Sequence, residues 1–205
     1  MPVNQKKKLL LHCCCAPCAT HVLECLMPEY EIAIFFYNPN IEPLEEYEKR
    51  KSEIDKLLVV RNVGHSLYQN CEVLSCEYDN EIFEQMVTEF RGEPERGVRC
   101  SLCFELRLTE TALKAKSEGF DAFATTLSVS PHKNAKTINE VGCRVSEEIE
   151  IEYLLSDFKK RDGFKRSTEL SARFGLYRQS YCGCINENNV PNVRMNGKYS
   201  TPKEM

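Results

Sequence analysis

The sequence predicts an α/β fold, a three-layer domain in which a parallel sheet is covered by helices on both faces. Short apolar runs of strand length alternate with longer segments of helical periodicity. Some of the runs are continuously apolar, as strands buried on both faces are. Parallel strands joined by right-handed helical crossovers produce this alternation. With 205 residues, the chain can bury a core and is shorter than chains that split into several domains.

The elements are predicted in order from the amino terminus. The run "KLLLH" (8–12) predicts a first strand, and a helical pattern at about 18–28 leads to a second strand, "YEIAIFFYN" (30–38). A helix at about 43–61 then precedes a third strand, "CEVLSC" (71–76). Each of these strands therefore has a helix between it and the next.

The second half of the chain continues the pattern. Helices are predicted at about 80–91 and 100–118, before a fourth strand, "DAFATTL" (121–127), and another helix is predicted at about 134–148. The helix at 100–118 is the clearest, because its apolar positions recur at i, i+4 and i+11 and Gly119 stands where a helix ends.

No linker or repeat divides the sequence. We expect residues 1–187 to form a single α/β metal-binding catalytic domain and residues 188–205 to form a flexible C-terminal tail.

Twelve cysteines indicate either a secreted disulfide protein or intracellular metal and thiol chemistry. Lys6–Lys8 could begin an export signal, but the apolar run Leu9–Leu11 is broken by His12 and is shorter than the roughly 7–15 residues that such a signal needs. No segment approaches the about 18 apolar residues of a membrane span. We therefore expect a cytoplasmic protein with reduced thiols and no membrane partner.

Eight of the cysteines fall into three clusters. They are Cys13, Cys14, Cys15 and Cys18; Cys100 and Cys103; and Cys182 and Cys184. A thioredoxin-like dithiol needs only two thiols, whereas a metal centre recruits ligands from distant parts of a chain, so the clusters favour metal binding. The isolated Cys25, Cys71, Cys76 and Cys143 are expected to be small buried hydrophobic residues.

The positions of the clusters support a site at one edge of the sheet. The first cluster follows the first predicted strand, and ligands of open parallel sheets bind beyond the carboxyl ends of strands. Cys100 and Cys103 share one face of the first turn of a predicted helix, where the helix dipole favours thiolates. Four thiolates suit zinc and a [4Fe–4S] cluster equally. More than four clustered thiols favour the cluster, with a second metal beside it.

Charge is unevenly distributed. The formal charge of −4 argues against a general nucleic-acid binder. The segment from Lys159 to Arg178, however, contains seven Lys and Arg residues and only two acidic residues, so its net charge is +5. The rest of the chain therefore carries a net charge of −9. This basic segment suits one anionic ligand, although a solvated helix face is the alternative explanation.

Five stretches, in this order, strongly resemble the cobalamin-independent epoxyqueuosine reductase family of the QueH type. They are "LLHCCCAPC" (10–18), "FFYNPNI" (35–41), "RCSLCFELRL" (99–108), "FATTLSVSPHKN" (123–134) and "YRQSYCGC" (177–184). The resemblance runs from about residue 9 to 186. It implies a nucleotide-binding-like, Rossmann-like α/β fold and the last step of queuosine biosynthesis, on the modified nucleoside at the wobble position of a tRNA anticodon.

The resemblance also implies the cofactor, partners and ligands. It implies a [4Fe–4S] cluster with a neighbouring mononuclear iron or other divalent metal, and as partners a tRNA that carries epoxyqueuosine and an unidentified electron donor. The family's cysteine pattern matches Cys14, Cys15, Cys100, Cys103, Cys182 and Cys184. Cys18 is a further candidate ligand, and Cys13 is an additional thiol beside the pair.

Several other residues are candidates for the substrate site. Those expected to bind substrate are Asn38, Asn40, Ser130, Lys133, Arg178 and Gln179, although turn formation explains Asn-Pro and the serine equally well. Those expected to contact nucleic acid are Lys159, Lys160, Lys165 and Arg166. His12 and His21 are expected to be structural.

Removal of an epoxide oxygen to leave an alkene takes two electrons and two protons. Side chains supply protons but not electrons, so a cofactor must carry the electrons. Candidates for the general acid are Tyr181, His132 and Asp157, and Asp157 opens a segment, "DFKKR", that resembles one in the family.

Two other functions remain open. One is a zinc-stapled RNA-binding module without catalysis. The other is a thiol-dependent tRNA sulfur-transfer enzyme, which is disfavoured because "CCCAPC" occupies the place where an ATP-using enzyme needs a Gly/Ser-rich phosphate loop.

Overall fold

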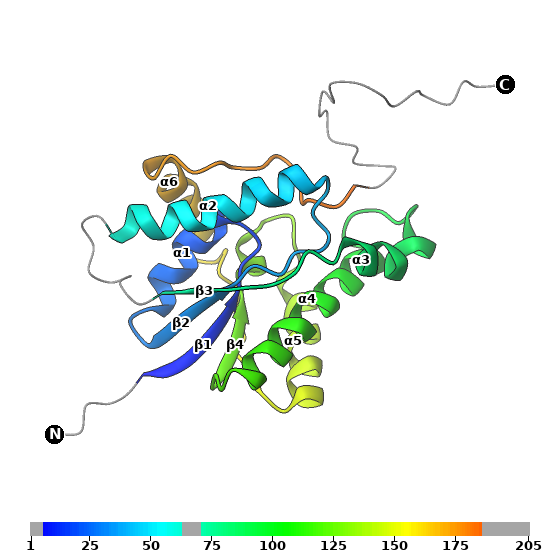
Figure 1. The fold of residues 1–205 in the computed structure, drawn as a ribbon, viewed down its shortest axis with the longest axis horizontal. Coiled ribbons are helices and arrows are strands. Elements are labelled where there is room, and N and C mark those ends of the chain that lie inside the picture. Colours follow the sequence, from blue (N-terminus) through cyan, green and yellow to red (C-terminus); the bar gives the residue numbers. More distant parts are fainter. Residues whose placement is uncertain (1–5, 63–70, 186–205) are drawn as a thin grey trace.

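The computed structural model describes residues 6–62 and 71–185 and has an α/β architecture (Figure 1). Its strands are β1 (Lys7–His12), β2 (Tyr30–Phe35), β3 (Val73–Leu74), β4 (Ala122–Thr125) and β5 (Glu152–Tyr153). Its helices are α1 (Ala16–Leu26), α2 (Leu44–Asn62), α3 (Asn80–Val87), α4 (Val98–Ser117), α5 (Ala135–Ile149) and α6 (Gly163–Arg173), with short 3₁₀ helices η2 (Thr88–Phe90) and η3 (Thr126–Val129).

The five strands form one parallel sheet in the order β3-β2-β1-β4-β5. Leu9 of β1 is paired with Ile32 on one side and with Ala122 on the other, so β1 is the central strand. The predicted α/β fold with a parallel sheet is confirmed.

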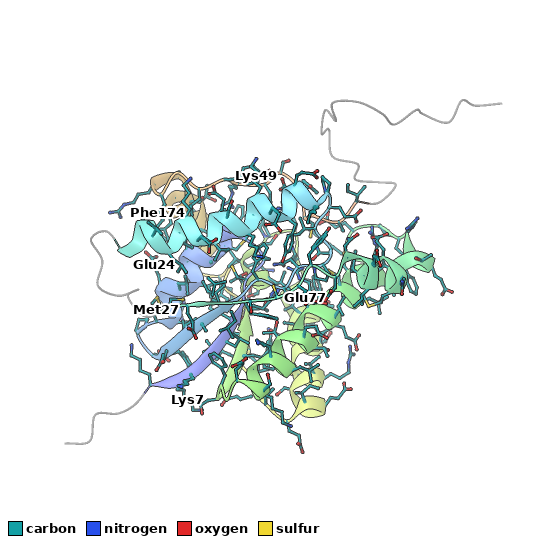
Figure 2. The ribbon with its side chains drawn as sticks, in the orientation of Figure 1. Lys7, Glu24, Met27, Lys49, Glu77 and Phe174 are labelled. Atoms are coloured by element: carbon teal, nitrogen blue, oxygen red, sulfur yellow. The ribbon has the colours of Figure 1, made fainter. Side chains whose placement is uncertain are left out.

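Helices cover both faces of this sheet (Figure 1). Leu9 and Leu11 point to the face that α1 and α2 cover, and Leu10 points to the face that α4 and α5 cover. All three leucines are fully buried, which explains why the first run is continuously apolar. Side chains fill the space on both sides of the sheet (Figure 2).

Two elements escape sequence prediction, β5 and α6. The strand β5 has only two residues. The helix α6 packs against α1 through small residues, because Gly163, Ser167 and Ser171 are buried and the Ser167 hydroxyl donates to the Pro17 carbonyl at 2.7 Å. Leu170 is also buried, but the other buried residues of α6 are glycine and serine, so few apolar residues mark the buried face of this helix in the basic segment.

The other elements lie close to their predicted places, with shorter strands. The third strand is reduced to Val73–Leu74, and the second ends at Phe35 instead of continuing to residue 38. The tail predicted at 188–205 lies outside the described residues. Among the helices of the described ranges, none combines the length and apolarity of a membrane span.

The strand order places a topological switch point between β1 and β4. The chain leaves β1 toward α1 on one face of the sheet, and it leaves β4 toward α5 on the opposite face. The two connections diverge at the carboxyl ends of these strands, which is where ligands bind in open α/β sheets. Cys13–Cys15 follow β1, and η3 follows β4, so the first cysteine cluster lies at this point.

Candidate metal centre

The first group of thiols comes from the β1–α1 connection. The sulfur atoms of Cys14, Cys15 and Cys18 all lie within 4.8 Å of one another, and those of Cys14 and Cys15 are 3.9 Å apart. The backbone N–H of Cys14 donates to the Thr126 hydroxyl oxygen at 3.1 Å, and that hydroxyl donates to the Cys14 sulfur at 3.3 Å. The residue that follows β4 therefore fixes both the backbone and the thiol of Cys14.

The second group of thiols lies next to the first. Cys100 and Cys103 are in the first turns of α4, as predicted, and Cys182 and Cys184 come from the segment after α6. All four line one small cavity of about 30 Å³. Two cysteine pairs from distant parts of the chain thus present their thiols to a common space.

Residues 176–185, which we call the C-terminal strap, bring Cys182 and Cys184 to this space. Arg50 of α2 donates to the carbonyl oxygen of Cys182 at 2.9 Å and to that of Tyr181 at 3.3 Å. The Glu42 N–H donates to the Gly183 carbonyl at 2.9 Å. The guanidinium of Arg50 also lies 4.9 Å from the centre of the Tyr181 ring. The strap is therefore anchored to α2 and to the loop before it.

Gly183 is required by the close approach of the strap. Its φ is +127°, and a Cβ atom added there would lie 2.8 Å from Cγ1 of Ile41 and 3.2 Å from Nη1 of Arg50. Only glycine combines this conformation with this contact.

A larger cavity of about 320 Å³ adjoins the two thiol groups. Cys14, Cys15, Cys18 and Cys182 line it. It brings together most of the residues predicted to serve the substrate and the proton transfer. These are Ser130, His132, Lys133, Arg178, Gln179 and Tyr181. Since Cys182 and Lys133 also line the smaller cavity, the two spaces are neighbours.

Asn38 and Asn40 are not among the described residues that line either cavity. The side-chain N–H of Asn38 donates to the Cys13 carbonyl at 2.9 Å, and the side-chain oxygen of Asn38 accepts from Arg107. Asn38 therefore stabilises the backbone of the cysteine loop. Asn40 is 1% exposed, and its amide nitrogen lies 3.3 Å from the position of a Cβ atom at Gly183. Both asparagines contact cysteine-bearing segments, and their predicted contact with substrate stays a prediction.

Asp157 is likewise absent from the described lining of both cavities. Its carboxylate is 3.5 Å from the Lys160 ammonium and 4.0 Å from that of Lys159. The predicted basic residues have different surroundings. Lys159 donates to the Lys133 carbonyl at 2.8 Å, and Arg166 donates to both carboxylate oxygens of Glu24 at 3.0 Å.

The electrostatics of the site favour thiolates at two positions. The pKa of Cys14 is held well below its usual value, first by hydrogen bonds from Cys15 and Cys18 and then by the charges of Lys133 and Arg107. A hydrogen bond from Cys184 and the same two cations lower the pKa of Cys182, although burial opposes them.

Arg107 is a functional residue that the sequence prediction missed. It is 2% exposed, its Nε donates to Nε2 of His12 at 3.3 Å, and its Nη1 lies 3.7 Å from the Cys103 sulfur. Burial and the Arg107 charge lower the pKa of His12 to about 3, so His12 is neutral. Its Nδ1 lies 2.8 Å from Thr125 Oγ1, and its Nε2 also lies 3.1 Å from the Tyr37 carbonyl oxygen. Spacing could have found Arg107, which lies four residues after Cys103 on the same helix.

The remaining thiols differ in burial. Cys13 is fully buried, which raises its pKa, and it donates to the Cys15 carbonyl at 3.4 Å. Cys76 is partly buried and donates to the Phe36 carbonyl at 3.2 Å. The expectation that Cys25 is buried is wrong, because it lies exposed on α1, 3.6 Å from the nearest ring nitrogen of His21.

The donor set fits a thiophilic metal. Two sulfurs bound to one tetrahedral ion at about 2.3 Å lie about 3.8 Å apart, close to the 3.9 Å between Cys14 and Cys15. Among the described residues, this first group alone brings three ligand atoms within 4.8 Å of one another. Buried thiolates beside Lys133 and Arg107 are softer ligands than carboxylates and favour zinc or iron. The cysteine-rich group can therefore bind a metal.

Comparison with known proteins gives a consistent match. The family model described as "Epoxyqueuosine reductase QueH" matches residues 9–189. Proteins of that name are 41% identical over 180 residues in Streptococcus pyogenes serotype M1 (88% of this chain, 70% of the relative) and 40% identical over 184 residues in Staphylococcus epidermidis (89% and 76%). A protein of the same name in Thermotoga maritima is 34% identical over 179 residues, which cover 86% of this chain and 88% of the relative.

Proposed function

The chain belongs to the epoxyqueuosine reductase QueH family, and we propose that it reduces epoxyqueuosine to queuosine at the wobble position of a tRNA anticodon. The reaction is the last step of queuosine biosynthesis, and its place is the cytoplasm, where the tRNA is. The observation that carries the proposal is the cavity of about 320 Å³ at the switch point, because thiols from two distant clusters line it together with cationic and polar side chains.

We propose that Cys100, Cys103, Cys182 and Cys184 hold a [4Fe–4S] cluster. These four thiols line one cavity, but no three of their sulfur atoms lie within 4.8 Å of one another, as the ligands of a single metal ion would. The arrangement suits a cluster in which each thiolate binds a different iron atom. Cys14, Cys15 and Cys18, with sulfurs within 4.8 Å, suit an adjacent mononuclear iron or other divalent metal. Such centres supply single electrons and Lewis acidity, which no side chain of the chain supplies.

The chain's own residues prepare the thiols for binding. Lys133 and Arg107 hold positive charge beside Cys14 and Cys182. Burial lowers the pKa of Lys133, but the charges of Cys182 and Cys14 outweigh burial and raise it, so Lys133 stays protonated. Thr126 fixes the rotamer of Cys14 through its hydroxyl. These contacts are the outer-shell support that thiolate ligands need.

The cavity also offers contacts for the modified nucleoside. The amide oxygen of Gln179 is buried and has no hydrogen-bond partner among the described residues, so it is free to accept from the nucleoside. Lys133 and Arg178 add positive charge, which suits the phosphate and hydroxyl groups of a nucleotide. We assign substrate binding to these residues and to Ser130, with Asn38 and Asn40 supporting the cavity from behind.

Two side chains of this cavity are candidate proton donors. The hydroxyl of Tyr181 donates to the Glu42 carbonyl at 2.5 Å, and burial raises the pKa of Tyr181 to about 12. His132 lines both cavities and is exposed, and its backbone N–H donates to the Ser130 hydroxyl at 3.2 Å. Because the Tyr181 proton is already engaged, we favour His132 over Tyr181, and both over the more distant Asp157.

The basic segment is proposed as the contact for the tRNA backbone. Lys160 and Lys165 are exposed, although Lys160 also lies 3.5 Å from the Asp157 carboxylate. Arg166 shares its charge with Glu24, and Lys159 is bound to a carbonyl. Lys160 and Lys165 therefore carry most of the proposed phosphate contact, with Lys159 and Arg166 contributing less.

Turnover of the natural substrate tests the function. Protein reconstituted anaerobically with iron and sulfide, a strong one-electron reductant and tRNA containing epoxyqueuosine should yield queuosine without cobalamin, read by mass spectrometry of the digested tRNA. Zinc-loaded protein should bind the tRNA and leave the epoxide intact. Equal conversion by the zinc form, or none by the iron form, would contradict the proposal and leave an RNA-binding module or a sulfur-transfer enzyme as the explanation.

A further inference from the structure

Arg99 is a buried cation beside the thiols of the smaller cavity. It lies in the first turn of α4, immediately before Cys100, and is 3% exposed. It lines the smaller cavity together with the four thiols that we assign to the cluster. A charge buried at this position calls for a partner, because an unpaired buried charge is costly.

The contacts of Arg99 engage only part of its guanidinium. Its Nη2 donates to the Ile185 carbonyl at 3.0 Å and lies 3.7 Å from a carboxylate oxygen of Glu84. The guanidinium carbon is 5.7 Å from the centre of the Phe83 ring. Nε and Nη1 are both buried and have no hydrogen-bond partner among the described residues. Two unpaired N–H donors at the wall of a thiol-lined cavity indicate a missing acceptor inside it.

We propose that Arg99 donates these N–H groups to sulfur atoms of the centre held by Cys100, Cys103, Cys182 and Cys184, and thereby raises its reduction potential. Hydrogen bonds to the sulfurs and the net charge around a cluster set its potential. A fixed positive charge favours the reduced form, which carries one more negative charge. The inference rests on the cluster assignment of the proposed function.

Ion pairing with acidic residues is the competing role for Arg99. A carboxylate oxygen of Glu84 lies 3.7 Å from Nη2 of Arg99. Glu42 is a second nearby acid, and burial and the Glu84 charge raise the pKa of Glu42 to about 7. If Arg99 only neutralised these carboxyl groups, its loss would affect stability without a specific effect on the potential. Arg91 is the matched control, because it donates to the other oxygen of Glu84 at 3.0 Å, is exposed, and does not line the described part of either cavity.

The test is a redox titration of anaerobically reconstituted protein, followed by electron paramagnetic resonance. In Arg99→Met, the ratio of reduced to oxidised cluster at a fixed ambient potential should fall about tenfold, equivalent to about 59 mV for a one-electron couple. Arg99→Lys keeps the charge but not the planar fork, so its ratio should fall less. Arg91→Met should leave the ratio unchanged. An unchanged potential in iron-loaded Arg99→Met, or equal shifts in Arg99→Met and Arg91→Met, would overturn the proposal.

A second measurement covers the case in which Arg99→Met does not assemble the centre. Arginine labelled with ¹⁵N should show a hyperfine coupling to the reduced cluster in the wild-type protein, and part of that coupling should be absent from Arg99→Lys. Identical couplings in the two proteins would overturn the proposal. If wild-type protein gives no iron–sulfur signal at all, the proposed function fails, and this failure is distinguishable from a failure of the role of Arg99.

Discussion

Arg50 and Cys182 are joined by a hydrogen bond of 2.9 Å that spans 132 residues of sequence. The donor is a guanidinium 2% exposed to solvent, and the acceptor is the backbone carbonyl of a candidate ligand. This bond ties α2 to the C-terminal strap, so we expect metal binding and the packing of α2 to be coupled.

Replacement of Arg50 tests that coupling. Arg50→Met should lower the free energy of unfolding of the metal-free protein by about 3–5 kcal/mol, because it removes one partner of a buried ion pair with Glu46. It should also lower iron content after reconstitution. Lys51→Met removes the same charge from the next position of α2 and should change neither quantity by a comparable amount. Chemical denaturation and iron analysis measure the two effects, and full iron content in folded Arg50→Met would refute the coupling.

Gly183 provides a backbone test of the same strap. Gly183→Ala adds a Cβ atom at 2.8 Å from Ile41 in a left-handed conformation, so the strap must move and iron content should fall. Gly175→Ala is the matched control, since Gly175 has a φ of +59° but no atom within 4 Å of an added Cβ. It should cost about 1 kcal/mol of stability and retain iron. Equal iron content in the two variants would show that the close approach is unimportant.

Thr126 should control the affinity of the first thiol group for metal. Thr126→Val removes the donor to the Cys14 sulfur and the acceptor for the Cys14 N–H while keeping a similar shape. Loss of such outer-shell contacts typically costs about 10–100-fold in metal affinity, and we expect an effect in that range. Thr126→Ser keeps the hydroxyl and should bind nearly as well as the wild type. Competitive titration with a metal indicator gives the affinities, and equal binding by the valine variant would argue against this role.

The basic segment should contribute the salt-dependent part of tRNA affinity. Lys160→Gln combined with Lys165→Gln should weaken binding and reduce the slope of log K against log salt by about one to two, because each lost phosphate contact removes about one released counterion. Lys7→Gln with Lys8→Gln is the control, since both lie exposed at the amino end of β1, the edge opposite the thiols, where Figure 2 labels Lys7. Filter binding at several salt concentrations measures the slope. Identical slopes in the two double variants would mean that Lys160 and Lys165 do not contact phosphates.

The sequence was most informative where chemistry and chain position coincide. The position of the first cysteine cluster was predictable, because an apolar run indicates a strand and cysteines directly after it must lie at the carboxyl edge of the sheet. The neighbouring position of Cys100 and Cys103 followed from helical spacing in the same way.

Other parts of the site depend on packing that no local pattern reports. Arg50 and Arg99 could not be assigned from sequence, because their roles arise only when the strap folds back onto α2 and α4. The helix α6 was missed because Leu170 shares its buried face with Gly163, Ser167 and Ser171, so few apolar residues mark that face. The hydrogen bond from the Asn38 amide to the Cys13 carbonyl could not be predicted either, because it depends on how β2 ends beside β1, and the predicted contact of Asn38 with substrate stays a prediction.

Metal and sulfide analysis of anaerobically purified protein shows whether the distant cysteine clusters together form an iron-binding site. We expect about four irons with matching acid-labile sulfide per chain, plus further iron or another divalent metal, and broad absorbance near about 400 nm. Serine at Cys103, Cys182 or Cys184 should lower the sulfide and iron, whereas Cys25→Ser and Cys143→Ser should not. Zinc without sulfide in the wild-type protein, or full iron and sulfide in all three serine variants of the clustered cysteines, would contradict this expectation.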